Sequence, residues 1–225
     1  MSKILQSFNR PITIIGGGEF VPEIFNFSLQ LGPDLIAVDG GLNYLNPKSH
    51  FPQWIIGDLD SVENAESWVK IGTKLKHLPE QDSTDFEKCL YSIDAPLYLA
   101  NGFLGNRVDH TLAACSTLVR RQDKNVILLG KKDLIVHLNK SIKLGLKVGT
   151  RLSLFPFKKV VGLKSFGLRY SITEIIFSPG SMIGTSNEVV SSEVEINIEG
   201  SGMLLILPID CLSKVLDSYG AYADV

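Results

Sequence analysis

The chain has 225 residues, of which 44% are hydrophobic and 20% charged, and its formal net charge is −2. This is the composition of an ordinary folded protein, without the basic surface of nucleic-acid-binding or membrane-binding proteins. No apolar run approaches the roughly 20 residues that span a bilayer, and residues 1–10 lack the apolar core of a secretory signal. We therefore expect a cytoplasmic protein that acts on small molecules, with neither nucleic acid nor a membrane as a partner.

Short apolar runs alternate with stretches of helical period up to about residue 130. The predicted strands are residues 12–15, 35–38, 54–56, 75–78, 97–99 and 126–129. Apolar residues at helical spacing predict two amphipathic helices, one with Phe86, Cys89, Leu90 and Ile93, the other with Val108, Leu112, Cys115 and Val119. This alternation is typical of a parallel, Rossmann-like α/β domain, which we place at residues 1–132.

After Asp133 the helical period vanishes. The segments 151–157, 193–198 and 203–207 follow one another with Gly, Pro, Ser and Asn between them. In 193–198 apolar and polar residues alternate, as in a strand with one solvated face. We predict an antiparallel β-sandwich over residues 133–225. The cysteines, Cys89, Cys115 and Cys211, lack metal-type pairing and are expected to be buried free thiols.

Aspartates follow several predicted strands. Asp39 follows the second, Asp58 and Asp60 the third, Asp85 the fourth and Asp109 the fifth. Because ligands of open parallel sheets bind at the carboxyl ends of the strands, we expect these side chains to meet at one edge. Carboxylate ligands without His or Cys suit a hard cation, and Mg²⁺ commonly shares such ligands with substrate phosphates. In extended backbone, Asp58 and Asp60 would also point to the same side.

Each aspartate also has a local explanation. Asp39-Gly40-Gly41 is a strong turn signal, and Asp60 could cap a helix that begins near Ser61. Thr84 to Glu87 has the form of a capping box, with Asp85 in the first helical turn. We favour a shared site, because one common ligand explains five aspartates at one edge better than five coincidences do.

Glycines mark two further candidates for anion binding. Gly16-Gly17-Gly18 suits either close approach to a phosphate or a tight turn, but it is not the dinucleotide-binding fingerprint. The segment from Gly102 to Arg107 opens a helix and offers a cation, which could instead form a surface ion pair. The sequence contains no P-loop, which disfavours a P-loop ATPase.

Several segments, taken in order, closely resemble the thiamine pyrophosphokinase family. In the first half they are Asp39-Gly40-Gly41, Gly57-Asp58-Leu59-Asp60-Ser61, the run from Pro79 to Lys88, and Gly102-x-x-Gly-x-Arg-x-Asp-His, ending at His110. In the second half, Gly167-Leu168-Arg169-Tyr170 and Gly184-Thr185-Ser186-Asn187-Glu188 are similar to that family's thiamine-domain signatures. Each segment alone is unspecific, whereas the ordered set is specific.

The resemblance implies a Mg²⁺-dependent homodimer, with sites between subunits, that transfers the diphosphate of ATP to thiamine and releases AMP. It implies metal ligands at Asp39, Asp58, Asp60 and Asp85, the last three also being catalytic. It implies ATP-binding residues at Asp39, Gly40, Lys88, Arg107 and Asp109. It implies thiamine-binding residues at Gln81, Tyr170, Thr185, Ser186 and Asn187.

Two departures from the family pattern leave alternatives open. Tyr170 stands where some members have tryptophan, although either ring can stack on a flat cationic heterocycle. Gln81 stands where many bacterial members have lysine. One alternative is diphosphate transfer to another heterocyclic alcohol, such as a hydroxymethyl pterin, and the other is a thiamine- or nucleotide-binding sensor without turnover.

Overall fold

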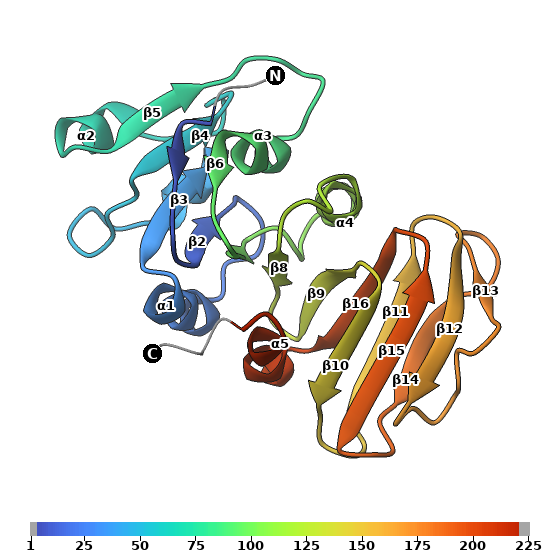
Figure 1. Ribbon diagram of the computed structural model, residues 1–225. Helices are drawn as coiled ribbons and strands as arrows, with labels where there is room; N and C mark the ends of the chain where they lie inside the picture. Colours follow the sequence, from blue (N-terminus) through green and yellow to red (C-terminus); the bar gives the residue numbers. More distant parts are fainter. Residues whose placement is uncertain (1–3, 221–225) are drawn as a thin grey trace. The chain divides into compact units, whose positions relative to one another are not determined.

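The computed structural model describes residues 4–220, which belong to two compact units (Figure 1). The first unit contains the chain up to Thr117 together with Asp123–Lys131. The second contains Leu118–Gln122 together with the chain from Lys132 onward. Within residues 4–220, no helix is both long enough and apolar enough to cross a membrane.

Parallel strands form the framework of the first unit. They are β2 (Ile12–Ile15), β3 (Asp34–Val38), β4 (Trp54–Gly57), β5 (Lys74–His77), β7 (Tyr98–Asn101) and β8 (Val126–Leu129). Strand β7 pairs in parallel with β2 and β8, β4 pairs in parallel with β3 and β5, and β3 lies beside β2. A short parallel pair joins β1 (Gln6–Ser7) and β6 (Ile93–Asp94). All six predicted strands of this half are confirmed, within two residues at each end.

Helices connect these strands. They are α1 (Pro22–Leu31), the 3₁₀ helix η1 (Asp39–Tyr44), α2 (Ala65–Lys70), α3 (Asp85–Ser92) and α4 (Val108–Arg120). Helix α3 buries Phe86, Cys89 and Leu90 as predicted, but Ile93 lies beyond its end, in β6. The apolar face predicted for α4 is wrong in its first half, because Val108 and Leu112 are 74% and 54% exposed.

The second unit contains two sets of antiparallel strands. One has the order β14 (Gly184–Glu188), β11 (Arg151–Pro156), β16 (Met203–Pro208), β9 (Asp133–Leu138). The other has the order β10 (Ser141–Gly145), β15 (Glu193–Glu199), β12 (Val160–Phe166), β13 (Ile176–Phe177). In β15, the residues Val194, Ile196 and Ile198 are buried and alternate with more exposed polar residues, which confirms the predicted solvated face. With its parallel and antiparallel strands, the chain has a mixed α/β fold.

A C-terminal helix corrects the expectation that helical period ends at Asp133. After the short 3₁₀ helix η2 (Ile209–Cys211), α5 (Leu212–Ser218) buries Leu212, Val215 and Leu216. These positions have the i, i+3, i+4 spacing of one helix face. Two turns give a weak periodic signal, and the apolar strand just before them obscures it.

Candidate active site at an acidic cluster

Three carboxylates of the first unit converge. Oxygen atoms of Asp39, Asp58 and Asp60 lie within 4.8 Å of one another, a grouping that could hold a metal ion. Asp39 directly follows β3 and Asp58 directly follows β4. These strands are parallel neighbours, so their carboxyl ends lie at the same edge of the sheet. The structure thus brings together three of the five predicted aspartates.

Asp39 has an unsatisfied oxygen. Its Oδ1 is buried and has no hydrogen-bond partner among residues 4–220. Burial raises the pKa of this carboxyl, the Gly40 N–H opposes the rise, and the charges of Asp85 and Asp58 add to it. A buried acceptor without a partner is costly and rare in folded proteins. A bound cation would supply the missing partner and offset the repulsion between the carboxylates.

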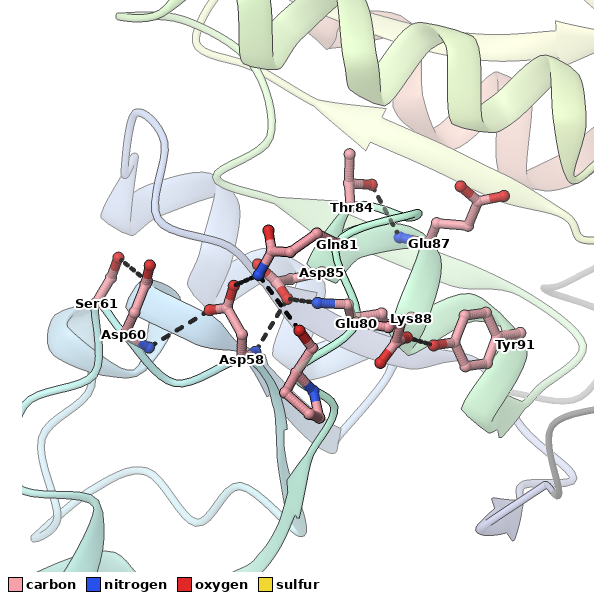
Figure 2. A network of polar contacts seen from close by, with 11 residues as sticks. Asp58, Asp60, Ser61, Glu80, Gln81, Thr84, Asp85, Glu87, Lys88 and Tyr91 are labelled. Carbon is pink, nitrogen blue, oxygen red and sulfur yellow. Dashed lines mark hydrogen bonds and ion pairs between the residues drawn. The ribbon is translucent and has the colours of Figure 1, made fainter.

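The segment from Asp58 to Asp60 is not extended, so the predicted reason for its two carboxylates pointing the same way is wrong. Leu59 has the left-handed backbone conformation, with φ of 66°. The Asp60 N–H donates to Asp58 Oδ1 at 3.4 Å, and the Ser61 hydroxyl donates to Asp60 Oδ1 at 2.8 Å (Figure 2). A turn, rather than strand alternation, therefore brings Asp58 and Asp60 together.

Asp60 does not cap a helix. The next helix, α2, begins at Ala65, and its N-cap residue is Asn64. The local explanation offered for Asp60 therefore fails. The turn explanation for Asp39 is also incomplete, since Asp39 opens the 3₁₀ helix η1 with φ of 44°.

Asp85 lies behind Asp58, outside the group of three. Its Oδ1 accepts hydrogen bonds from the Asp58 N–H at 3.1 Å and from Lys88 Nζ at 2.9 Å (Figure 2). The Lys88 side chain is only 2% exposed, so its ammonium is directed at Asp85 and not toward solvent. The helix-cap prediction is also confirmed, because Thr84 Oγ1 accepts from the Glu87 N–H at 3.3 Å. Asp85 thus has two roles. It lies in the first turn of α3, and it binds the backbone of Asp58, a member of the acidic cluster.

Gly57 belongs to this site but was not among the predicted site residues. A Cβ atom at this position would lie 3.0 Å from Asp39 Cβ and 3.3 Å from Asp85 Oδ1. Because Gly57 has no side chain, Asp39 and Asp85 can pack closely against its backbone. In the sequence, Gly57 opens one of the segments that resemble the family, but nothing there gives it a role of its own.

The loop between β5 and α3 brings Gln81 to the same place. Gln81 Nε2 lies 3.4 Å from Asp58 Oδ2 and 3.4 Å from the Pro79 carbonyl oxygen (Figure 2). The Tyr91 hydroxyl donates a hydrogen bond to Glu80 in the same loop. Burial and this contact raise the pKa of Tyr91 to about 12, and the contact lowers the pKa of Glu80. Tyr91 was not predicted, because nothing near it in sequence marks the contact.

The glycine-rich segments are explained by close packing. The amides of Gly16 and Gly18 donate to the Asn101 and Gly102 carbonyls at 2.8 and 2.7 Å, so neither is available to a phosphate. A Cβ at Gly16 would lie 2.6 Å from the Phe103 ring, and one at Gly18 would lie 2.7 Å from the Gly102 oxygen. The tight turn, rather than an anion site, therefore accounts for both glycines.

Asp109 lies outside the cluster and pairs with Arg107. Arg107 Nη2 lies 2.5 Å from Asp109 Oδ2, and Nε lies 3.2 Å from Oδ1. Both side chains are more than 60% exposed, at 64% and 65%. This hydrogen bond raises the pKa of Arg107 and lowers that of Asp109. The surface ion pair considered for Arg107 is present, and Asp109 is not among the three aspartates whose oxygens converge.

The thiamine-side residues of the second half differ in exposure. The Tyr170 residue is 63% exposed, and Thr185 and Ser186 are exposed as well. Asn187 is only 6% exposed, and its side chain bonds to the backbone of Tyr170. The structure therefore places three of these residues at the surface of the second unit and one beneath it. All three cysteines are buried and free, as predicted.

Each half of the chain matches a known protein family domain. Residues 32–129 match the family described as "Thiamin pyrophosphokinase, catalytic domain", and residues 135–203 match "Thiamin pyrophosphokinase, vitamin B1 binding domain". The chain is 31% identical over 178 residues to Thiamin pyrophosphokinase 1 of Caenorhabditis elegans, covering 71% of this chain and 72% of that protein. It is 30% identical over 177 residues to Thiamine pyrophosphokinase 1 of Arabidopsis thaliana, covering 68% and 64%.

Solved structures share the fold. Thiamin pyrophosphokinase from Candida albicans superposes with a TM-score of 0.75 at 17% identity, covering 92% of this chain and 93% of that chain. Thiamine pyrophosphokinase from Bacillus subtilis gives 0.70 at 20% identity, covering 88% and 98%. Identities this low show the fold alone. The sequence matches go further, and on them the chain belongs to the thiamin pyrophosphokinase family.

Proposed function

We propose that this protein transfers the diphosphate group of ATP to the hydroxyl of thiamine, giving thiamine diphosphate and AMP. Matches to both the catalytic and the vitamin B1 binding domains of the family support this. The single observation that carries the proposal is the convergence of Asp39, Asp58 and Asp60, one of which, Asp39, has a buried oxygen without a partner in the described part of the chain. A kinase of this kind needs a site for a divalent cation, and this arrangement suits one.

We propose Mg²⁺ as the cation, because the donors are all carboxylate oxygens. Asp39, Asp58 and Asp60 would hold it. Asp85, expected as a fourth ligand, is bonded to Lys88 and to the Asp58 N–H, and its proposed part is to hold Asp58 in place. When bound, the ion supplies neutralisation of the charge on polyphosphate oxygens.

The residues of this chain act mainly by orientation. In phosphoryl-group transfer most of the rate gain comes from positioning and electrostatic stabilisation, with little covalent chemistry asked of the protein. Gly57 leaves space for Asp39 and Asp85, while Asp85 fixes the backbone at Asp58. Gln81, next to Asp58, is proposed to face the thiamine hydroxyl during in-line attack on the β-phosphorus.

Other residues are proposed to hold the two substrates. Gly40, Arg107 and Asp109 would bind ATP, Arg107 by exchanging its exposed ion pair for a phosphate. Tyr170, Thr185 and Ser186 would bind thiamine, Tyr170 with its exposed aromatic ring.

The finer architecture belongs to the same proposal. We assign residues 1–132 to a Rossmann-like catalytic domain and residues 133–225 to a thiamine-binding β-sandwich. The parallel strands of the first half and the antiparallel strands of the second support this assignment. We also propose a cytoplasmic homodimer with its sites at the subunit interface. Light scattering should then report twice the chain mass of 24.7 kDa.

Product analysis tests the reaction. The purified protein is incubated with thiamine, Mg²⁺ and ATP labelled in both the β- and γ-phosphates, and hydroxymethyl pterin replaces thiamine in a parallel reaction. We expect AMP and doubly labelled thiamine diphosphate, with no product from the pterin. Formation of ADP, or transfer of the γ-label alone, contradicts diphosphate transfer. Saturable thiamine binding without any product would identify a sensor instead.

A further inference from the structure

Asn187 occupies an unusual position in β14. Its neighbours Thr185 and Ser186 are both exposed, although successive residues of a regular strand face opposite sides. The pairing of β14 with β11 shifts between Leu152 and Leu154, which marks a bulge. Ser186 has φ of 60° there. Bulges re-aim side chains, and this one leaves Asn187 only 6% exposed.

The Asn187 side chain is committed to the protein itself. Its Oδ1 accepts hydrogen bonds from the Tyr170 N–H at 3.1 Å and from the Glu188 N–H at 2.8 Å. Its Nδ2 donates to the Tyr170 carbonyl oxygen at 2.7 Å. Two N–H donors directed at one atom identify that atom as the oxygen. The amide therefore holds both backbone polar groups of Tyr170.

These bonds extend a short antiparallel ladder. Leu168 forms a bridge with Val189, and the Arg169 N–H donates to the Glu188 carbonyl at 2.8 Å. In this register, Tyr170 stands opposite Asn187. The backbone of Asn187 pairs on its other side with Leu152 of β11. The Asn187 side chain therefore makes the contacts that fix Tyr170.

The position of Tyr170 depends on its hydrogen bonds with Asn187 and on the contacts of its neighbours. An ion pair of 2.9 Å between Arg169 and Glu188 holds the preceding residue. Tyr170 itself is 63% exposed, so burial of its ring does little to fix it. An aromatic ring recognises a flat cationic heterocycle well only when its orientation is set beforehand, because ordering it on binding costs affinity.

We propose that Asn187 is a positioning residue, which orients the Tyr170 ring as the platform for thiamine and does not itself contact the substrate. The inference rests on the proposed function and deepens it. Sequence resemblance groups Asn187 with the residues that bind thiamine. The structure separates the roles, since Thr185, Ser186 and Tyr170 are exposed and Asn187 lies beneath them.

A double-mutant cycle tests the proposal. The variants are Asn187→Ala, Tyr170→Ala and their combination, and the readouts are KM for thiamine, KM for ATP, kcat and calorimetric thiamine binding. We expect each single change to weaken thiamine binding about tenfold, as befits loss of roughly one aromatic–cation contact. We expect the double variant to be no weaker than Tyr170→Ala, because Asn187 acts only through Tyr170. KM for ATP should stay within about twofold.

A second readout needs no substrate. Hydrogen exchange of the Tyr170 amide should be faster in Asn187→Ala than in the unsubstituted protein, because its acceptor is gone. Asn187→Asp keeps the acceptor for both N–H groups and places an oxygen against the Tyr170 carbonyl, so it should fold and still weaken thiamine binding. Asn197→Ala is the matched control, since Asn197 lies in β15 and bonds to Glu195 at 2.9 Å. It should leave KM for thiamine unchanged.

The outcomes separate this proposal from the proposed function. Multiplicative losses in the double variant would show that Asn187 affects thiamine binding independently of Tyr170. That result would overturn the positioning role without contradicting the proposed activity. Unchanged exchange at Tyr170 in Asn187→Ala would overturn it too. Absence of thiamine binding by the unsubstituted protein contradicts the proposed function, and the exchange experiment still decides whether Asn187 fixes Tyr170.

Discussion

Asp39 combines features that ordinary surface aspartates do not share. It is partly buried, one of its oxygens has no partner among residues 4–220, and its backbone is left-handed. Burial raises its pKa, and the nearby charges of Asp85 and Asp58 contribute. Such a group destabilises the folded protein when ionised unless a cation compensates it.

The substitution Asp39→Asn should therefore stabilise the metal-free protein at neutral pH. The raised pKa means that the folded state binds more protons than the unfolded state between the ordinary and the raised value. The free energy of unfolding of the unsubstituted protein thus falls as pH rises through this range. Asparagine cannot ionise and tolerates the left-handed backbone. Urea unfolding with a chelator present, at a series of pH values, measures the difference.

The advantage of the asparagine variant should vanish in acid, below the ordinary aspartate pKa, where both proteins are uncharged at this position. Excess Mg²⁺ should reverse the order at neutral pH, since ligand binding stabilises only the protein that retains the site. If Asp39→Asn were less stable than the unsubstituted protein at neutral pH with the chelator, the Asp39 carboxylate would not be destabilising the metal-free fold.

Gly57→Ala should impair activity without unfolding the protein. The added methyl group would lie 3.0 Å from Asp39 Cβ and 3.3 Å from Asp85 Oδ1, so both aspartates must shift. Misplacement of catalytic groups by about 1 Å can cost on the order of 100-fold in rate, and we expect a loss of at least about tenfold in kcat/KM. Gly149→Ala is the control, because Gly149 also has a positive φ, 88° against 157° at Gly57, and nothing lies within 4 Å of a Cβ there. It strains the backbone without crowding a neighbour. Equal activities of the two variants would contradict the crowding.

At the scale of elements, helix α3 contacts the acidic cluster through Asp85, which binds the backbone of Asp58. Its first turn carries Asp85, and Lys88 stands one turn further along the same helix. Asp85 Oδ1 joins the Lys88 ammonium to the Asp58 backbone, so the helix and the end of β4 are connected through one carboxylate oxygen. The position of Asp58 therefore depends on the start of α3.

Loss of the α3 cap should lower stability. Thr84 Oγ1 accepts from the Glu87 N–H, and removing such an N-cap costs about 1 kcal/mol. Thr84→Ala should reduce the free energy of unfolding by this amount, whereas Thr84→Ser keeps the hydroxyl and should lose less than about half of it. Denaturant unfolding of both variants measures the effect. A serine variant as unstable as the alanine variant would argue against the cap.

At the scale of the whole molecule, the buried thiols report on each unit separately. Cys89 and Cys115 belong to the first unit, and Cys211 belongs to the second. Burial raises the pKa of Cys89 to about 12 and that of Cys115 to about 11. Since the thiolate is the reactive form, these groups should be inert in the folded protein.

We expect a thiol reagent in mildly alkaline buffer to leave Cys89 and Cys115 unmodified, and to label all three cysteines after denaturation. Peptide mass spectrometry at increasing denaturant identifies which unit opens first. Rapid labelling of Cys89 in the native protein would contradict its burial.

The sequence predicted the regular elements best where burial is uniform. Val126–Leu129 is buried along its whole length, so an unbroken apolar run marks it. Ile12–Ile15 is also fully buried, and its one polar residue, Thr13, donates a hydrogen bond to the Gly32 carbonyl. Helix α5 and the exposed start of α4 could not be predicted in the same way. The periodic signal of two turns is weak, and apolar spacing shows that a face exists without showing whether another element covers it.

What the sequence determined by itself was the order of strands and the placement of aspartates after them, because both depend on local pattern and on the geometry of parallel sheets. Only the tertiary structure decided which acids meet. Asp109 pairs with Arg107, Lys88 turns inward to Asp85, and a bulge buries Asn187 under Tyr170. The acidic cluster itself depends on the turn at Leu59. The position of Asn187 depends on a contact between distant segments, and the turn depends on one backbone angle. The two ion pairs are local, but they depend on which of several partners each side chain takes. A pattern of residue types records none of these choices.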